Sequence, residues 1–172
     1  MFSSIEIRPA RNEDADSVAQ IYTESILARD STMDTEVFVA EDITALLDRL
    51  TERERLFVLT VDKDIKGWGI VKHYNDRPGY SVACETSVYV YRDSVGRGLG
   101  SRLQKRLMDH CRQVGFHHIV TKIWAENKSS IAFHVRHGFT LVGIQHEIGR
   151  IDGQWKNIAL MECVLPYRNT GR

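Results

Sequence analysis

The spacing of apolar residues along the chain changes several times, and each change predicts a secondary-structure element. Up to residue 91 the pattern predicts a strand at 5–8, a helix capped by Asn12, a second helix from about 42 to 53, a strand pair at 56–61 and 65–73, and a long strand at 82–91. Beyond residue 102 it predicts a helix that ends at Gly115, a strand at 117–125, a short helix at 129–137, and a strand pair at 139–149 and 154–165. Strands and helices therefore alternate, which is typical of an α/β fold with a mixed central sheet.

No internal repeat and no linker rich in proline, glycine or serine divides the chain. We therefore expect a single domain over residues 1–172, with a core at about 4–165 and a short polar C-terminal tail. A chain of this length buries roughly 70% of its unfolded surface, so it needs no disulfide or metal to fold.

The 23 basic and 23 acidic side chains cancel, so the chain lacks the basic excess on which sequence-independent nucleic-acid binding depends. We therefore expect a small or uncharged molecule as the partner.

No apolar run approaches the roughly 20 residues that cross a bilayer, and the N-terminus becomes charged at its sixth residue, so we expect neither membrane insertion nor export. Cys84, Cys111 and Cys163 form no CxxC pair, and no HExxH-like spacing occurs. These patterns predict a cytoplasmic protein without a metal site.

Residues 95–101 read VGRGLGS and lie between a predicted strand and a predicted helix. Glycines at such a junction let backbone N–H groups approach an anion at the positive end of the helix. A triphosphate-binding P-loop is disfavoured because Gly100 is followed by Ser101 and Arg102 instead of Lys-Ser/Thr, and the GxGxxG dinucleotide pattern also fails. The segment therefore predicts a phosphate or pyrophosphate site, the alternative being turn glycines that only precede a helix.

The predicted central strand carries one acidic residue, Glu85, among apolar and aromatic neighbours. Side chains of a strand alternate between faces, so Glu85 shares a face with Ser87 and Tyr89, while Cys84 points the other way. A carboxylate there is costly unless it is paired, hydrated or used. Glu85 is either a general base for an amine, acting directly or through a water, or a carboxylate that reaches solvent at the edge of a cleft. An acyl-cysteine route through Cys84 is disfavoured.

Several motifs together resemble one family. GRGLG at 96–100 is similar to the pyrophosphate loop of the GCN5-related N-acetyltransferases, written Gln/Arg-x-x-Gly-x-Gly/Ala. From Ser4 to Leu165 the chain resembles the phosphinothricin acetyltransferase group of that superfamily, through IRPA near the start, RPGY at 77–80, ETSVYV at 85–90, ENKSSIAFHVRHGF at 126–139 and GQWKN at 153–157. The resemblance implies a mostly antiparallel sheet, acetyl-CoA as cosubstrate and a homodimer. It also implies direct acetyl transfer, in a ternary complex, to a small amino acid or analogue such as phosphinothricin or methionine sulfoximine.

The same resemblance implies roles for individual residues. Glu85 would be the general base, and His134 would protonate the departing thiolate or orient the amine, the alternative for His134 being a histidine on the helix surface. The acceptor's carboxylate or phosphinate would be held by Arg77 and Tyr80, with Ser87 lining that pocket. Ser130 would cap its helix and touch CoA. The full set of expected CoA-binding residues is Val88, Tyr89, Val90, Val95, Gly96, Arg97, Gly98, Leu99, Gly100, Ser101, Asn127 and Ser130.

Two alternatives stay open at this point. A peptide or protein N-acetyltransferase would use the same chemistry on a larger acceptor. A CoA-binding sensor without catalysis is suggested by Val95, which stands where the family pattern has Gln or Arg. Asn75 occupies a position at which herbicide-resistance members carry a basic residue, which argues against phosphinothricin itself as the acceptor.

Overall fold

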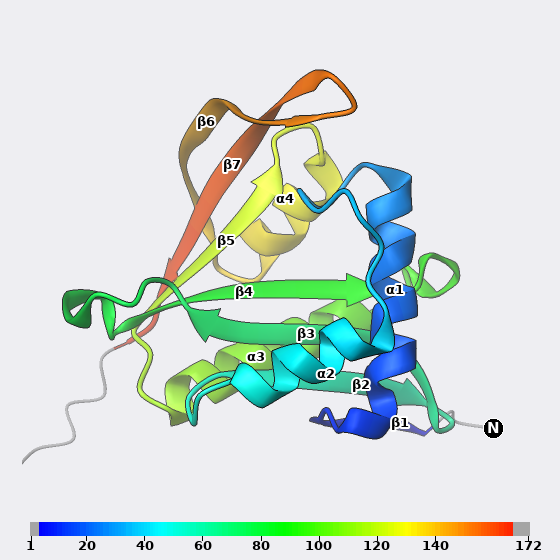
Figure 1. Ribbon diagram of the computed structural model, residues 1–172. Helices are drawn as coiled ribbons and strands as arrows, with labels where there is room; N and C mark the ends of the chain where they lie inside the picture. The colour runs from blue at the N-terminus through cyan, green and yellow to red at the C-terminus, as the bar shows by residue number, and fades with distance from the viewer. Residues whose placement is uncertain (1–3, 167–172) are drawn as a thin grey trace, which may run out of the picture.

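The computed structural model describes residues 4–166, and its strands form a single seven-stranded sheet with the order β1-β2-β3-β4-β5-β7-β6 (Figure 1). Every neighbouring pair is antiparallel except β4 and β5, which are parallel. The predicted mixed, mostly antiparallel sheet is thereby confirmed. The strands are β1 (Ile5–Pro9), β2 (Arg55–Val61), β3 (Asp64–His73), β4 (Ala83–Val90), β5 (His118–Trp124), β6 (Thr140–Ile151) and β7 (Gln154–Val164). The predicted polar tail at 168–172 lies outside the described residues.

Helices cover both faces of the sheet (Figure 1). They are α1 (Ala15–Ala28), α2 (Ala40–Arg49), α3 (Leu99–Gln113) and α4 (Lys128–Arg136). On one face, Val18, Ile21 and Ile26 of α1 and Ile43 of α2 pack on apolar side chains of β2 and β3. On the other face, Leu107 and Cys111 of α3 pack with residues of β3, β4, β5 and β7. This burial follows the predicted apolar faces of the two longer helices.

The strands β4 and β5 pair only at their beginnings. Residues 83–85 of β4 lie opposite residues 118–120 of β5, although β4 continues to Val90 and β5 to Trp124. Figure 1 shows β5 turning away from β4 beyond that point, with β7 and β6 beside it. The sheet therefore opens in its middle, on the C-terminal side of Glu85.

The first helix begins later than the sequence predicted. Residues 12–14 form a 3-10 turn instead of a cap and first helical turn, and α1 begins at Ala15. The cause is Asp14, whose carboxylate accepts hydrogen bonds from the Arg8 guanidinium at 2.7 and 2.8 Å and from the Arg11 N–H at 2.7 Å. This ion pair lowers the pKa of Asp14. A cap formed by Asn12 is therefore wrong.

The second helix is displaced toward the N-terminus, to Ala40–Arg49 instead of about 42–53. The Asp42 carboxylate accepts the Val39 N–H at 2.9 Å, which places the cap at Val39. The Glu54 carboxylate accepts the Thr51 N–H at 2.9 Å, which holds the following residues in a turn. Local side-chain hydrogen bonds thus set both ends, and the apolar period alone does not reveal them.

Three further properties of the described chain limit its chemistry. No helix within residues 4–166 is long and apolar enough to cross a membrane. Over the same span no cluster of three His, Cys, Asp or Glu side chains is arranged to hold a metal ion. Cys84, Cys111 and Cys163 are free and buried, and the hydrogen bond with Cys111 together with burial raises the pKa of the Cys84 thiol far above its usual range. Cys84 is therefore a protonated core residue on the face opposite Glu85.

Candidate functional site

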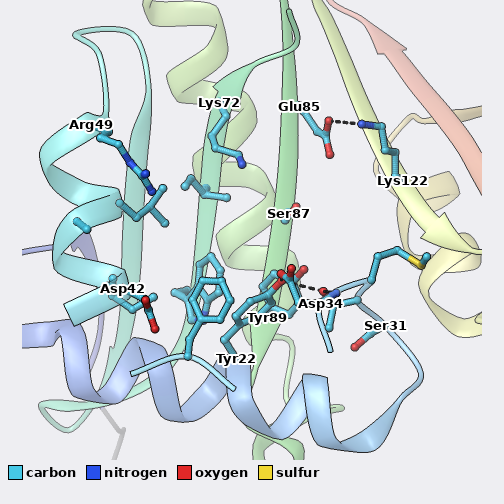
Figure 2. Close-up of a pocket in the computed structure, with 18 of the residues that line it drawn as sticks. Tyr22, Ser31, Asp34, Asp42, Arg49, Lys72, Glu85, Ser87, Tyr89 and Lys122 are labelled. Carbon is cyan, nitrogen blue, oxygen red and sulfur yellow. Dashed lines mark hydrogen bonds and ion pairs between the residues drawn. The ribbon is translucent and has the colours of Figure 1, made fainter. Parts of the chain in front are cut away.

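A cavity of about 580 Å³ lies over the face of β4 that carries Glu85, and we call it the charged cavity. Glu85, Ser87 and Tyr89 line it together with Lys72, Ile70 and Trp68, their register partners on β3. The opposite wall comes from α2 and from the segment between α1 and α2, as Figure 2 shows. The predicted alternation of β4 is thereby confirmed, because all three expected side chains reach one cavity.

Glu85 is half-buried and forms an ion pair across the opening of the sheet. The ammonium of Lys122, on β5, donates to its carboxylate at 2.7 Å (Figure 2). The Glu85 side chain is 26% exposed, so the carboxylate is both paired and open to the cavity. A carboxylate that is held in place beside a cavity can accept a proton from a molecule bound there.

An aromatic cluster forms the floor of the charged cavity beside Glu85. The ring of Tyr89 lies 4.7 Å from that of Trp68 and 4.9 Å from that of Tyr22, between ring centroids. Burial raises the pKa of Tyr89 to about 12, so its phenol stays protonated at neutral pH. The Tyr22 hydroxyl donates to Asp34 and shares a hydrogen bond of 2.7 Å with Thr32. These bonds tie the segment between α1 and α2 to α1.

A second cavity, of about 750 Å³, lies where β4 and β5 separate, and we call it the gap cavity. Its walls come from the end of β4, the start of α4, the end of α1 with the residues after it, and the start of β7. The predicted CoA-binding residues that line it are Val88, Tyr89, Val90, Val95, Asn127 and Ser130. The cap of α4 is Asn127, whose side-chain oxygen accepts the Ser130 N–H at 3.1 Å, so the expected cap by Ser130 is wrong.

The glycine loop lies beside this cavity at the N-terminus of α3. Gly96 and Gly98 have φ values of +83° and +77°, which side chains with a Cβ rarely adopt. A Cβ at either position would meet no atom within 4 Å, so the loop is open on that side. The N–H groups of residues 96–101 have no hydrogen-bond partner within residues 4–166. Unpaired N–H groups at the start of a helix form an anion site.

The loop residues beyond Val95 do not line the gap cavity itself. Gly96, Arg97, Gly98, Leu99, Gly100 and Ser101 are absent from its walls. Leu99 is buried against Leu59 and Leu103, so only its main chain is available. The loop thus contributes backbone groups next to the cavity, and its side chains contribute little to the wall.

The two cavities meet at Ser31, Tyr89 and Trp124, which line both of them. The Ser31 hydroxyl and the Trp124 indole nitrogen are buried there without a hydrogen-bond partner in the described part of the chain. Molecules bound in the two cavities would therefore touch at this junction, which is the geometry that a direct transfer between them requires.

His134 lies inside the protein and lines neither cavity. It is 6% exposed and packs edge-on against Phe133 and Phe139, so a place on the helix surface is wrong. Its Nδ1 lies 2.8 Å from the Ser130 carbonyl oxygen, which can only accept, so Nδ1 carries the hydrogen. Burial lowers the pKa of His134 despite this hydrogen bond. The neutral ring therefore has its free lone pair on Nε2.

Arg77 and Tyr80 are not brought into the cavity that contains Glu85. Arg77 precedes a 3-10 turn at Pro78–Tyr80, and Tyr80 stacks edge-on with Tyr74 at 5.6 Å between centroids. Tyr80 lines a third, mainly apolar cavity of about 380 Å³ with Val82 and other residues. Ser87 is the one predicted acceptor-binding residue that lines the charged cavity.

The sequence did not predict three basic side chains that line the charged cavity: Arg49, Lys72 and Lys122. Lys122 interrupts an apolar strand in the same way as Glu85 does, and this signal could have identified it. Lys72 and Arg49 carry no such signal, because each lies near the end of its element in an ordinary polar position.

Comparisons with known proteins agree on one family. A profile of the acetyltransferase (GNAT) domain matches residues 7–159. The chain is 30% identical to phosphinothricin N-acetyltransferase of Streptomyces coelicolor, covering 93% of the chain and 96% of the relative. It is 29% identical to the L-methionine sulfoximine/L-methionine sulfone acetyltransferase of Salmonella typhimurium, covering 92% and 94%. A phosphinothricin acetyltransferase from Sinorhizobium meliloti, solved in complex with acetyl-CoA, superposes with a TM-score of 0.88 at 26% identity, covering 96% of this chain and 89% of that one.

Proposed function

The chain belongs to the GNAT acetyltransferase family, and we propose from this premise that it transfers the acetyl group of acetyl-CoA to the amino group of a small amino acid or amino acid analogue. The membership agrees with the resemblance predicted from the sequence motifs. The observation that carries the proposal is the junction at Ser31, Tyr89 and Trp124, where two cavities of suitable size meet. The gap cavity takes the cosubstrate and the charged cavity takes the acceptor amine.

The glycine loop supports binding of the cosubstrate's pyrophosphate. Its free N–H groups at residues 96–101 stand at the positive end of α3, and the space above Gly96 and Gly98 is open. Because main-chain groups supply these hydrogen bonds, Val95 at the position of Gln or Arg is compatible with binding. Acetyl-CoA supplies the activated thioester, and its transfer forms a C–N bond while the C–S bond breaks.

Glu85 is the proposed general base for the acceptor amine. A free α-amino group has a pKa of about 8, so removing its proton near pH 7 costs about 1.4 kcal/mol for the one pKa unit. A carboxylate at the cavity wall suffices for this, directly or through a water. Holding the amine against the thioester contributes on the order of 7–11 kcal/mol, so the positioning supplied by the two cavities has the larger effect.

His134 lines neither cavity, so we propose that it supports the reaction from behind the cavity walls while Glu85 acts on the acceptor. Its Nδ1–H is held by the Ser130 carbonyl, so the neutral ring can accept a proton at Nε2 but has none to deliver from that atom. The lowered pKa of His134 keeps this neutral form at neutral pH. The ring therefore suits taking up a proton or orienting α4 better than protonating the departing thiolate directly.

The proposed activity is tested by release of thiol. The protein is incubated with acetyl-CoA and a panel of free amino acids, including L-methionine sulfoximine and phosphinothricin, and with short peptides. Thiol release with at least one free amino acid or analogue is expected. Release with peptides alone would favour the alternative of a peptide acetyltransferase. Tight acetyl-CoA binding without any release would favour the sensor.

We also propose that the protein is a cytoplasmic homodimer. The rim of the third cavity exposes Tyr74, Tyr80, Val82 and Val142, and an apolar surface of this kind supports self-association. Three free cysteines support a reducing compartment. Sedimentation of the protein at micromolar concentration is expected to give twice the mass of the chain, and a monomer would contradict the dimer.

A further inference from the structure

Two basic side chains in the charged cavity have no partner in the part of the chain that the structure describes. Arg49 of α2 and Lys72 of β3 are exposed, and neither forms an ion pair or a side-chain hydrogen bond within residues 4–166. The third basic residue, Lys122, is bonded to Glu85. Arg49 and Lys72 are therefore the cations of this cavity that are free to bind an anion.

The two unpaired cations of the charged cavity lie away from its two aspartates. In Figure 2, Arg49 and Lys72 reach toward the same region, on the side where α2 ends, whereas Asp42 and Asp34 lie at the other end near Tyr22 and Tyr89. Arg49 follows Asp42 by two helical turns, so both lie on the face of α2 that lines the cavity. An anion would be attracted to the end that contains Arg49 and Lys72.

The register of the sheet places this anion site next to the proposed base. Lys72 is the direct partner of Glu85 in the antiparallel pair of β3 and β4. Directly opposed residues point to the same face with their Cβ atoms about 4.5–5.5 Å apart. An α-amino acid carries its amino group and its carboxylate on one carbon, so a base and a cation at this separation can contact both groups of one molecule.

Resting on the proposed function, we propose that Arg49 and Lys72 hold the carboxylate of the acceptor while its amino group lies at Glu85. The guanidinium of Arg49 can grip a carboxylate through two N–H groups, and the ammonium of Lys72 adds a compact charge. This assigns to Arg49 and Lys72 the role that sequence reasoning gave to Arg77 and Tyr80. The site then selects free α-amino acids and rejects amines without a neighbouring carboxylate, including the N-termini of peptides.

The first test compares an amino acid with its own amide in the unaltered protein. L-methionine sulfoximine and its α-carboxamide are offered with saturating acetyl-CoA, or the fastest free amino acid of the thiol-release panel and its carboxamide where another one is turned over better. The proposal expects kcat/KM to be about tenfold or more lower for the amide, because the carboxylate's hydrogen bonds to charged groups are lost. Equal values for acid and amide would overturn it.

The second test removes each cation without changing the length of the side chain much. Lys72→Met and Arg49→Met are each expected to raise KM for the free amino acid about tenfold, with a smaller effect on kcat and none on KM for the amide. Lys63→Met, in the turn between β2 and β3, is the matched control and should behave like the unaltered protein. Calorimetric binding of acetyl-CoA shows that each variant is folded.

The outcomes separate this proposal from the proposed function. An increase in KM that is equal for acid and amide would assign Arg49 and Lys72 a structural role and overturn the carboxylate site. Absence of thiol release from every free amino acid and analogue in the unaltered protein would instead contradict the proposed function, whatever the variants do.

Discussion

The gap cavity and the charged cavity are built in different ways. The part of the gap cavity that the sequence predicted, with its adjoining loop, comes from short continuous segments, residues 88–90, 95–101 and 127–130, and the loop offers main-chain N–H groups. The charged cavity instead gathers side chains from β3, β4, β5 and α2 and from the segment between α1 and α2. A site made of continuous backbone leaves a motif in the sequence, whereas a site made of converging side chains does not.

The basic side chains of the two cavities also differ in whether they have partners. In the gap cavity, Arg92 pairs with Asp30 at 2.7 Å, Arg29 pairs with Asp152 at 3.1 Å, and the Lys156 ammonium lies 4.6 Å from the centre of the Trp124 ring, so these basic side chains already have partners. In the charged cavity Arg49 and Lys72 are unpaired among the described residues. In the proposed function, the cosubstrate therefore binds mainly N–H groups of the loop, and the acceptor binds ionised side chains.

The largest effect is expected from removing the proposed base in the charged cavity, which should leave acetyl-CoA binding unchanged. Glu85→Gln keeps the shape of the side chain but removes the base, so kcat should fall about 100-fold, within the range that a positioned base contributes. Steady-state kinetics and calorimetry together check this, since the dissociation constant for acetyl-CoA should not change. Glu6→Gln, on β1 at the far edge of the sheet, is the control. A kcat within twofold of the unaltered value would remove Glu85 from the reaction.

The next largest effect is expected from a substitution in the glycine loop, which should weaken acetyl-CoA binding and leave the acceptor site unchanged. Gly98→Val forces a β-branched residue into a backbone with φ of +77°, so the loop's N–H groups move and the dissociation constant for acetyl-CoA should rise about tenfold or more. Acceptor KM at saturating acetyl-CoA should stay the same.

Two controls separate backbone strain from loss of the binding site. Gly115→Val imposes the same strain, at φ of +81°, at the far end of α3 and should leave acetyl-CoA binding unchanged. Val95→Ala removes a side chain that is 66% exposed and should also change little. If Val95→Ala weakened binding as much as Gly98→Val does, a cradle of main-chain groups would be refuted.

A smaller effect is expected on the pH dependence of folding stability. Burial lowers the pKa of His134 below its ordinary value of 6.5, so the unfolded chain binds a proton there more readily than the folded one. The stability due to the neutral ring is fully present above pH 6.5 and is lost as the pH falls below it. Thermal unfolding between pH 7.5 and 5 should therefore show a smaller decrease in midpoint for His134→Gln than for the unaltered protein. His110, whose pKa burial also lowers, keeps the decrease from vanishing.

The smallest expected effect concerns the ion pair at the base. Lys122→Met removes the partner of Glu85, and because the Lys122 side chain is 46% exposed, the free energy of unfolding should change by less than about 1 kcal/mol. Chemical denaturation of Lys122→Met, Glu85→Gln and the double variant measures the coupling. A coupling of several kcal/mol would mean that the pair is structural and that Glu85 is not free to serve a substrate.

What the sequence could predict follows the same division. Apolar spacing gave the elements, and the alternation of β4 placed Glu85, Ser87 and Tyr89 on one face. The neighbours Lys72 and Lys122 depend on which strands pair and in what register, and no local pattern specifies that. Arg77 and Tyr80 lie outside the charged cavity for a related reason, because no local pattern specifies the path of the turn before β4. The burial of His134 depends on how Phe133 and Phe139 pack.

The separation of β4 and β5 has a consequence for the solubility of the protein. Beyond residues 85 and 120 each strand has an edge without a partner strand, so the fold carries two unprotected strand edges in its interior instead of only at its margins. Such edges invite pairing with a strand of another molecule, and natural proteins commonly discourage this with lysine and with strong twist. Lys122 lies on the unpaired stretch of β5, and lysine is one of the residues that discourage such pairing.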